Sequence, residues 1–361
     1  MKKKVAVAMS GGVDSSLTAA ILLYRGFEVV GVTMQLEDEE FHEKSCCSSR
    51  EVQDAKAVAD KLGIVHFVAD FRNIFRTEIE SYFVAEYLRG RTPNPCVRCN
   101  KKIKFGKLFD FAEYIGADYL ATGHYARIVF EDDRYKLKKG VDIKKDQSYV
   151  LYNIPADKLS RILFPLGEMS KSDTRALAEK LKLPVADKPD SQEICFIPNN
   201  DYKNFISNRA GSVDALKAGD IVDTAGKILG RHNGVANYTI GQRKGLGIAA
   251  PTPLYVVNLD VEKRLVTVGK SDELFASELT AKDVHWIYKP QNFPVTLQAK
   301  IRYGPRVADC TVENFGENLR VKFFEPQRAI TAGQSVVFYD GDELIGGGVI
   351  ELRIKNLGFR I

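Results

Sequence analysis

Hydrophobic and polar positions follow two different periods along roughly the first 200 residues. Short apolar runs predict strands at 4–9, 28–34, 64–69 and 118–122 (KVAVAM, EVVGVTM, IVHFVA and DYLAT). Residues 50–63, REVQDAKAVADKLG, instead repeat their apolar side chains every three to four positions and end on Gly63, which predicts a helix. Short apolar strands that alternate with such helices indicate an α/β domain, with a parallel sheet covered by helices on both faces.

The pattern changes further along the chain. We predict a hairpin at about 127–139 with its turn at Asp132 and Asp133, and helices near 155–163 and 171–182. After about residue 205 the helical period gives way to short strand-like runs between Gly and Asp turns, and from about 280 almost every segment predicts a strand. The chain therefore divides into an α/β domain (1–205), a small β-rich central module (206–278) and a C-terminal antiparallel β-barrel (279–361).

A glycine turn joins the first predicted strand to a helix-like segment. Gly11 and Gly12 would let phosphate oxygens approach main-chain N–H groups, and a helix that opens at Ser15 and Ser16 would attract an anion. The lysine of a G-x-x-x-x-G-K-[ST] loop is missing. Asp14 suits a phosphate site that also holds Mg²⁺. The alternative is an ordinary glycine turn with an Asp/Ser helix cap.

Composition describes an ordinary globular chain: 361 residues, 45% hydrophobic and 27% charged, with a net charge of only +5. The basic start, Met1 to Lys4, resembles a signal peptide, but the apolar run after it breaks at Ser10 and Asp14. Apolar stretches all fall short of the roughly 20 residues that span a membrane. These features predict a cytoplasmic protein with reduced cysteines and no membrane partner.

Cysteines and cations coincide in the segment GRTPNPCVRCNKKIKFGK, residues 90–107, which has six basic residues and no acidic one. Such a stretch indicates contact with a nucleic-acid backbone, or else a solvated charge run. Cys96 and Cys99 lie inside it, where neighbouring cations should lower a thiol pKa. Cys195, in DSQEICFIP, is predicted to lie in a short apolar strand, where alone it would be a core cysteine.

Seven motifs occur in one order along nearly the whole chain: SGGVDSS, GRTPNPCVRCNKKIKFG, ATGHYAR, KDQSYVLY, ICFI, GQRKGLGI and GQSVVFYDGDELIGGGVIE. The first resembles the PP-loop of ATP pyrophosphatases, whose fold is a Rossmann-like parallel sheet of the adenine nucleotide alpha hydrolase type. Together the seven resemble the tRNA-specific 2-thiouridylases, the MnmA family. The resemblance implies a sulfurtransferase that uses ATP to adenylate the C2 oxygen of the wobble uridine in tRNA. A cysteine persulfide then supplies sulfur, either directly or as sulfide released by Cys99, and AMP and pyrophosphate are released.

The same resemblance implies a role for each matching residue. The nucleophile is Cys99 and the persulfide carrier is Cys195, and the two form a transient disulfide. The ATP site comprises Ala8, Met9, Ser10, Gly11, Gly12, Val13, Asp14, Ser15, Met34 and Gly123. Asn94, Pro95 and Cys96 meet the target base, and tRNA contacts come from His124, Lys145, Asp146, Gln147, Arg302, Tyr303 and Gln334. Implied partners are tRNA and a sulfur-donor protein, and a monomer is expected.

Cys96 departs from the family pattern, which commonly has aspartate there. Three cysteines, Cys96, Cys99 and Cys195, could instead hold a [4Fe–4S] cluster or a structural zinc ion. Two other functions remain open: a PP-loop enzyme that adenylates a small metabolite, and a non-catalytic RNA-binding protein with a vestigial nucleotide fold. The vicinal pair Cys46 and Cys47 has no evident role, and Cys310 is expected in the barrel core.

Overall fold

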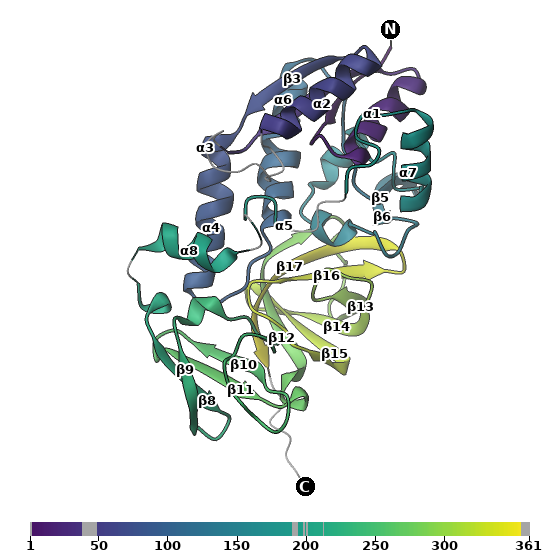
Figure 1. Ribbon diagram of the computed structural model, residues 1–361. Helices are drawn as coiled ribbons and strands as arrows, with labels where there is room; N and C mark the ends of the chain where they lie inside the picture. Colours follow the sequence, from purple (N-terminus) through teal and green to yellow (C-terminus); the bar gives the residue numbers. More distant parts are fainter. Residues whose placement is uncertain are drawn as a thin grey trace. The chain divides into compact units, whose positions relative to one another are not determined.

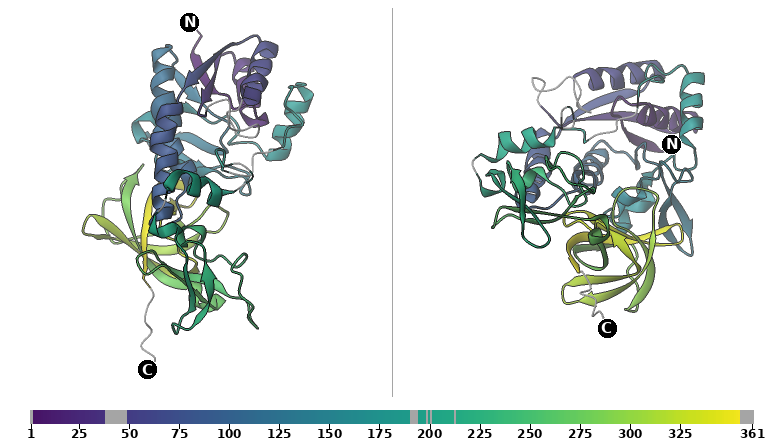
Figure 2. Two further views of the ribbon diagram at one scale, coloured as in Figure 1. Left: turned by 60° about the vertical axis from the view of Figure 1, so that its left-hand side comes forward. Right: turned by 60° about the horizontal axis from the view of Figure 1, so that its bottom comes forward.

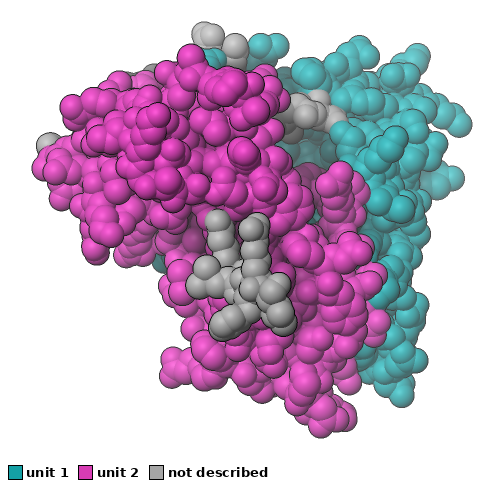
Figure 3. Space-filling model, turned by 90° about the horizontal axis from the view of Figure 1, so that it is seen from below, with its two compact units in different colours: residues 1–80, 95–200, 341–345 teal, residues 81–94, 201–340, 346–361 magenta. Residues whose placement is uncertain are grey.

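The computed structural model describes residues 2–37, 49–189, 194–197, 199, 201–211 and 213–354. Figure 3 colours its two compact units, each assembled from separate parts of the chain. Unit 1 comprises residues 1–80, 95–200 and 341–345, and unit 2 comprises residues 81–94, 201–340 and 346–361. Cys46 and Cys47 lie outside the described residues.

Unit 1 is built on a five-stranded sheet with the order β3-β2-β1-β4-β7, in which every neighbouring pair is parallel. Its strands are β1 (Lys4–Ala8), β2 (Glu28–Gln35), β3 (Val65–Asp70), β4 (Tyr119–Ala121) and β7 (Ile162–Leu163). The order reverses at β1, so the carboxyl ends of β1 and β4 form a topological switch point, where such sheets bind ligands. This confirms the predicted parallel α/β sheet (Figure 1).

Helices of unit 1 connect these strands (Figures 1 and 2). The α-helices are α1 (Val13–Tyr24), α2 (Ser49–Leu62), α3 (Arg72–Phe75), α5 (Pro95–Cys99), α6 (Leu108–Tyr114) and α7 (Lys171–Lys180). Unit 1 also has two π-helices, η1 (Arg76–Glu80) and η2 (Asn100–Lys107), and two 3₁₀ turns, η3 (Ser148–Leu151) and η4 (Ala156–Arg161). The predicted stripe on α2 is buried at Ala55, Val58 and Ala59.

Local sequence predicts the hairpin of unit 1 well, and it predicts the helix after it except for where that helix ends. Strands β5 (Ala126–Glu131) and β6 (Arg134–Lys139) flank Asp132 and Asp133, whose φ angles of 51° and 56° are those of a tight hairpin turn. The helix predicted near 155–163 is present as the 3₁₀ helix η4, but it ends at Arg161 because the next two residues pair with β4 as β7. A two-residue strand is too short to show a period.

Unit 2 contains two β structures. Its helical elements are α4 (Ser81–Leu88), α8 (Tyr202–Ala210), η6 (Asp214–Leu216), η7 (Val235–Asn237) and η8 (Ser271–Leu274). A four-stranded sheet with the order β10-β11-β8-β9 is formed by β8 (Gly219–Asp223), β9 (Ile228–His232), β10 (Tyr255–Asp260) and β11 (Leu265–Gly269). Ile221, Val256 and Val266 are fully buried in its core.

The second β structure is an antiparallel barrel with the order β12-β15-β14-β13-β16-β17, closed by pairing of β12 with β17. Its strands are β12 (Phe275–Trp286), β13 (Val295–Lys300), β14 (Ala308–Phe315), β15 (Asn318–Arg328), β16 (Ser335–Asp340) and β17 (Glu343–Ile354). The sheet, the β-rich module and the barrel together confirm the predicted fold class. Within the described ranges, no helix combines the length and the apolar character needed to cross a membrane.

Candidate functional site

The glycine turn lies at the carboxyl end of β1, directly before α1. Gly11 has a φ of +68°, and a Cβ there would come within 2.5 Å of the Glu51 carbonyl oxygen, so only glycine fits. Gly12 is the N-cap of α1. Because glycine has no side chain, it cannot cap the first N–H groups of the helix. The first N–H groups of α1 therefore remain available to an anion.

Gly123 brings the carboxyl end of β4 against this turn. A Cβ on Gly123 would lie 2.9 Å from the Asp14 carbonyl carbon and 2.9 Å from the Ser15 nitrogen. The close approach explains why glycine follows β4 here. Met34, also assigned to the ATP site, is buried in β2 with 9% of its surface exposed.

Two lysines from distant parts of unit 1 converge on the turn. Lys171, at the start of α7, places its Nζ 2.7 and 2.8 Å from the two carboxylate oxygens of Asp14. The Tyr125 hydroxyl donates to the same carboxylate at 2.8 Å. Lys188 donates to the Gly11 carbonyl at 3.1 Å and to the Asp54 carboxylate at 2.9 Å. The turn therefore has ammonium groups beside it although its own motif lacks a lysine.

Glu51 adds an unusual acid next to Gly11. Burial raises the pKa of the Glu51 carboxyl to about 7, while the nearby Lys188 ammonium acts in the opposite direction. Its Oε1 lies 3.6 Å from the Lys188 Nζ, and its Oε2 is buried with no hydrogen-bond partner in the described structure. Near neutral pH this side chain is therefore close to half protonated.

The cysteines gather in unit 1, but their local structure differs from the prediction. Cys96 and Cys99 lie one helical turn apart on α5. Cys195 lies in a turn within residues 194–197 and not in a strand, so the predicted strand is wrong. Cys96, Cys99 and Cys195 are present as thiols, and the charge of a Cys195 thiolate acts on both of the others. Coulombic coupling of this kind requires proximity.

The expectation of a lowered thiol pKa is wrong. Burial raises the pKa of Cys96 to about 11 and that of Cys99 to about 12, and Lys104 offsets only part of this effect. Cys99 is buried, whereas Cys96 is exposed. Most of the neighbouring cations extend toward solvent or pair with acids, as Lys102 and Arg98 do with Glu78. Desolvation therefore dominates.

His124 links the cysteine segment to the glycine turn. Its Nε2 lies 3.4 Å from the Lys104 Nζ, and its Nδ1 contacts the Thr122 hydroxyl. Burial, and then the Lys104 charge, hold the pKa of His124 well below its ordinary value, so the imidazole is neutral. Since Gly123 lies between Thr122 and His124, residues 122–124 contact both the start of α1 and the cation that acts on Cys99.

The donor groups of this site do not match the metal sites that the sequence suggests. Among the residues that the structure describes, no three His, Cys, Asp or Glu side chains are placed to hold a metal ion together. This arrangement does not suit a cluster or zinc ion on Cys96, Cys99 and Cys195. Asp14 does not fit as a Mg²⁺ ligand either, because Lys171 and Tyr125 already occupy its carboxylate.

The residues assigned to tRNA differ in exposure. In unit 1, the Asp146 carboxylate is buried and accepts hydrogen bonds from Gly140 and Ser148, while Gln147 pairs with the backbone of Tyr125. Lys145 is half-buried. Asp146 therefore shapes the loop that presents Lys145.

In unit 2, Arg302 is exposed, and Tyr303 has 51% of its surface exposed. The Gln334 amide donates to the Thr92 carbonyl at 2.9 Å and to the Pro93 carbonyl at 3.4 Å. Thr92 N–H in turn donates to the Ala332 carbonyl. Gln334 thus fixes the segment that leads to Asn94.

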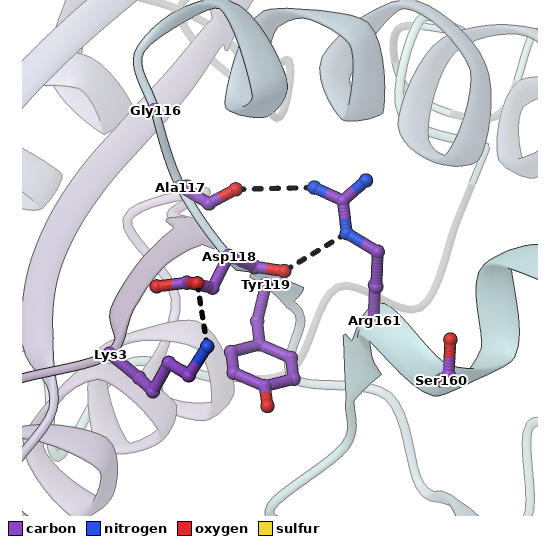
Figure 4. Close-up of a pocket in the computed structure, with 7 residues that line it drawn as sticks. All are labelled: Lys3, Gly116, Ala117, Asp118, Tyr119, Ser160 and Arg161. Carbon is purple, nitrogen blue, oxygen red and sulfur yellow. Dashed lines mark hydrogen bonds and ion pairs between the residues drawn. The ribbon is translucent and has the colours of Figure 1, made fainter.

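A recess at the amino ends of β1 and β4 is separate from the glycine turn, which lies at the carboxyl ends of these strands. Figure 4 shows it at the amino end of β4, where Lys3 pairs with Asp118 at 3.0 Å and Arg161 bonds backbone carbonyls. Its volume is about 420 Å³. Because its charged groups pair with one another and the glycine turn lies at the other end of the strands, we assign it no part in the chemistry.

Sequence reasoning missed the groups that come from far along the chain. No local pattern marks Lys171, Lys188 or Tyr125 as partners of the glycine turn. The only local signal for Lys171 is the helix start itself, where Ser170 caps α7 by accepting from the Asp173 N–H. Which lysine reaches Asp14 depends on the packing of α7 against α1.

Comparison with known proteins agrees with this geometry. Family models match over most of the chain: the tRNA methyl transferase HUP domain at residues 3–199, the tRNA methyl transferase PRC-barrel domain at 203–270 and the aminomethyltransferase beta-barrel domain at 276–350. The HUP domain fold supports ATP binding.

Curated relatives align along nearly their full length. The tRNA-specific 2-thiouridylase MnmA of Carboxydothermus hydrogenoformans is 52% identical, with 98% of this chain and 99% of the relative covered. MnmA 1 of Caldanaerobacter subterraneus subsp. tengcongensis is 49% identical (98% and 100% covered), and MnmA of Acetivibrio thermocellus is 50% identical (97% and 99% covered). With its glycine turn, grouped cysteines and domain order, the chain belongs to the tRNA-specific 2-thiouridylase (MnmA) family.

Proposed function

We propose that the protein is an ATP-dependent tRNA sulfurtransferase that converts the wobble uridine of tRNA to 2-thiouridine. One observation carries the proposal: the segment 122–124 contacts the glycine turn through Gly123 and the cysteine-associated Lys104 through His124. A nucleotide cradle and a pair of coupled thiols therefore lie in one unit, as activation of a carbonyl followed by sulfur transfer requires. The relatives named above are 2-thiouridylases, which supports the same substrate.

ATP activates the uridine in the first step of the proposed reaction. The C2 oxygen attacks the α-phosphorus, the bond to the β-phosphate breaks, and pyrophosphate leaves with the bonding electrons. Oxide is a very poor leaving group, whereas AMP is a good one. The uridine must leave its stack to reach the site, at a cost of a few kcal/mol.

Sulfur transfer follows on the adenylated base. The terminal sulfur of a Cys195 persulfide attacks C2, and AMP leaves with the original oxygen. Cys99 then attacks the inner sulfur of Cys195, so that a Cys99–Cys195 disulfide forms and the outer sulfur remains on C2. An external thiol reductant must restore the two cysteines. The Coulombic coupling of Cys99 and Cys195 supports this pairing.

Binding of tRNA is proposed to use both units. Asn94, Pro95 and Cys96 are assigned to the target base, and Lys145, Arg302 and Tyr303 offer exposed or half-buried groups for the backbone. The barrel that we place at 279–361 and the loop with Arg243 and Lys244 would add phosphate contacts. We further propose that the protein is a cytoplasmic monomer that receives sulfur from a donor protein. Mg²⁺ would accompany ATP on its phosphates.

The experiment is thiolation of unmodified tRNA by the Cys195→Ser variant. We expect 2-thiouridine formation to be lost while tRNA affinity stays within about twofold of wild type. Cys310→Ser is the matched control. Cys310 is a buried thiol of the barrel, and it donates a hydrogen bond to the Leu297 carbonyl at 3.4 Å. Normal 2-thiouridine formation by Cys195→Ser would refute the assigned sulfur carrier.

A further inference from the structure

Lys171 occupies the place beside the glycine turn where the sequence suggests a metal ion. Its Nζ contacts both carboxylate oxygens of Asp14, at 2.7 and 2.8 Å, and only 12% of the lysine side chain is exposed. The Tyr125 hydroxyl donates to the Oδ1 atom of the same carboxylate at 2.8 Å. The positive charge next to the turn is thus part of the protein itself.

The position of this ammonium group relates it directly to a bound phosphate. Asp14 is the second residue of α1, so its carboxylate lies at the helix turn whose N–H groups receive an anion. An ion held there would meet the Lys171 ammonium as well. Charge-assisted hydrogen bonds of this kind are the strong ones in phosphate sites.

A purely structural role explains the arrangement less well. An ion pair removed from water gains little net stability compared with an apolar contact. Apolar side chains already pack α1 against α7 through Leu17 and Ala178, both fully buried. The lysine is also held in place at its backbone, since Lys171 N–H donates to the Asp142 carboxylate at 3.0 Å. Such fixing suits a cation that must be oriented before its ligand arrives.

We propose that Lys171 binds the β- and γ-phosphates of ATP and that Asp14 positions this lysine instead of binding Mg²⁺. The inference rests on the proposed function, in which pyrophosphate leaves with the electrons of the broken bond. A cation at the β-phosphate stabilises that leaving group. Lys171 thereby supplies, from 157 residues beyond Asp14, the charge that the turn's own motif lacks.

The test measures binding of α,β-methylene ATP and of AMP by calorimetry, with Mg²⁺ and separately with EDTA. K171M should weaken binding of α,β-methylene ATP about 10- to 100-fold in both buffers, and K171R should restore most of the affinity. AMP affinity should not change, because AMP lacks the β- and γ-phosphates. D14N should also weaken binding of α,β-methylene ATP in both buffers. K180M is the matched control at the exposed far end of α7, and it should bind as wild type does.

Three results would overturn the proposal. One is wild-type affinity of K171M for α,β-methylene ATP. Another is an equal loss of affinity for AMP in K171M, which would indicate that the lysine has only a structural role. The third is a D14N effect confined to the Mg²⁺ buffer, which would make Asp14 a metal ligand. Since none of these measurements uses tRNA, they are independent of whether the wild-type protein forms 2-thiouridine.

Discussion

Burial of Cys99 predicts a thiol that reacts slowly, and with a steep dependence on pH, in the protein without tRNA. Its pKa of about 12 lies well above the reference value of 9.0 for cysteine. The thiolate is the reacting species, so at pH 8 only about 1 in 10,000 molecules is reactive at Cys99, compared with about 1 in 10 for an ordinary cysteine.

The assay is alkylation by iodoacetamide between pH 7 and pH 10, followed peptide by peptide with mass spectrometry. The rate at Cys99 should rise about tenfold for each pH unit without reaching a plateau. Poor access lowers the absolute rate at a buried thiol but does not change this slope, so the slope is the measured quantity.

Lys104→Met should slow alkylation of Cys99 further, because Lys104 is the largest of the effects that lower its pKa. Lys107→Met is the matched control, since Lys107 lies 3.6 Å from Asp110 and does not act on Cys99. A plateau in the Cys99 rate below about pH 9, or an unchanged rate in Lys104→Met, would refute the reasoning.

Three further predictions address the turn and the basic segment. Gly123→Ala places a Cβ 2.9 Å from the backbone of Asp14 and Ser15, which should cost about 1–3 kcal/mol of ATP binding by calorimetry; wild-type affinity would contradict the close packing. Because burial raises the pKa of Glu51 from 4.5 to about 7, its contribution to stability is present below about pH 4.5 and is lost as pH rises through 7, by roughly 3 kcal/mol. Glu51→Gln should flatten the pH dependence of urea unfolding, and curves parallel to wild type would exclude this effect. Lys101→Met removes an exposed cation of the basic segment and should reduce the salt slope of tRNA binding by about one; an unchanged slope would place Lys101 outside the interface.

Features set by neighbours in sequence were predictable here. The apolar runs of β1 and β2, the stripe on α2 and the Asp132–Asp133 turn each depend on residues within one element, and the structure confirms them. The glycine turn was identified because Gly11 needs a backbone conformation that other residues avoid. Its position at a strand end then followed from the predicted sheet.

Features that depend on tertiary packing were not predictable. Strand β7 exists because Ile162 and Leu163 pair with β4, and two residues carry no period. The basic segment suggests low thiol pKa values, but Lys104 offsets only part of the effect of burial on the pKa of Cys99. Lys171 reaches Asp14 across 157 residues, and no local pattern marks that contact.

The account depends most on the transfer of a uridine oxygen to AMP. The direct measurement is a single turnover with ATP and tRNA whose wobble uridine carries ¹⁸O at C2, followed by mass spectrometry of the released nucleotide. The account predicts that the ¹⁸O appears in AMP in proportion to the 2-thiouridine formed. Recovery of the ¹⁸O in water or inorganic phosphate, or release of ADP in place of AMP, would contradict it.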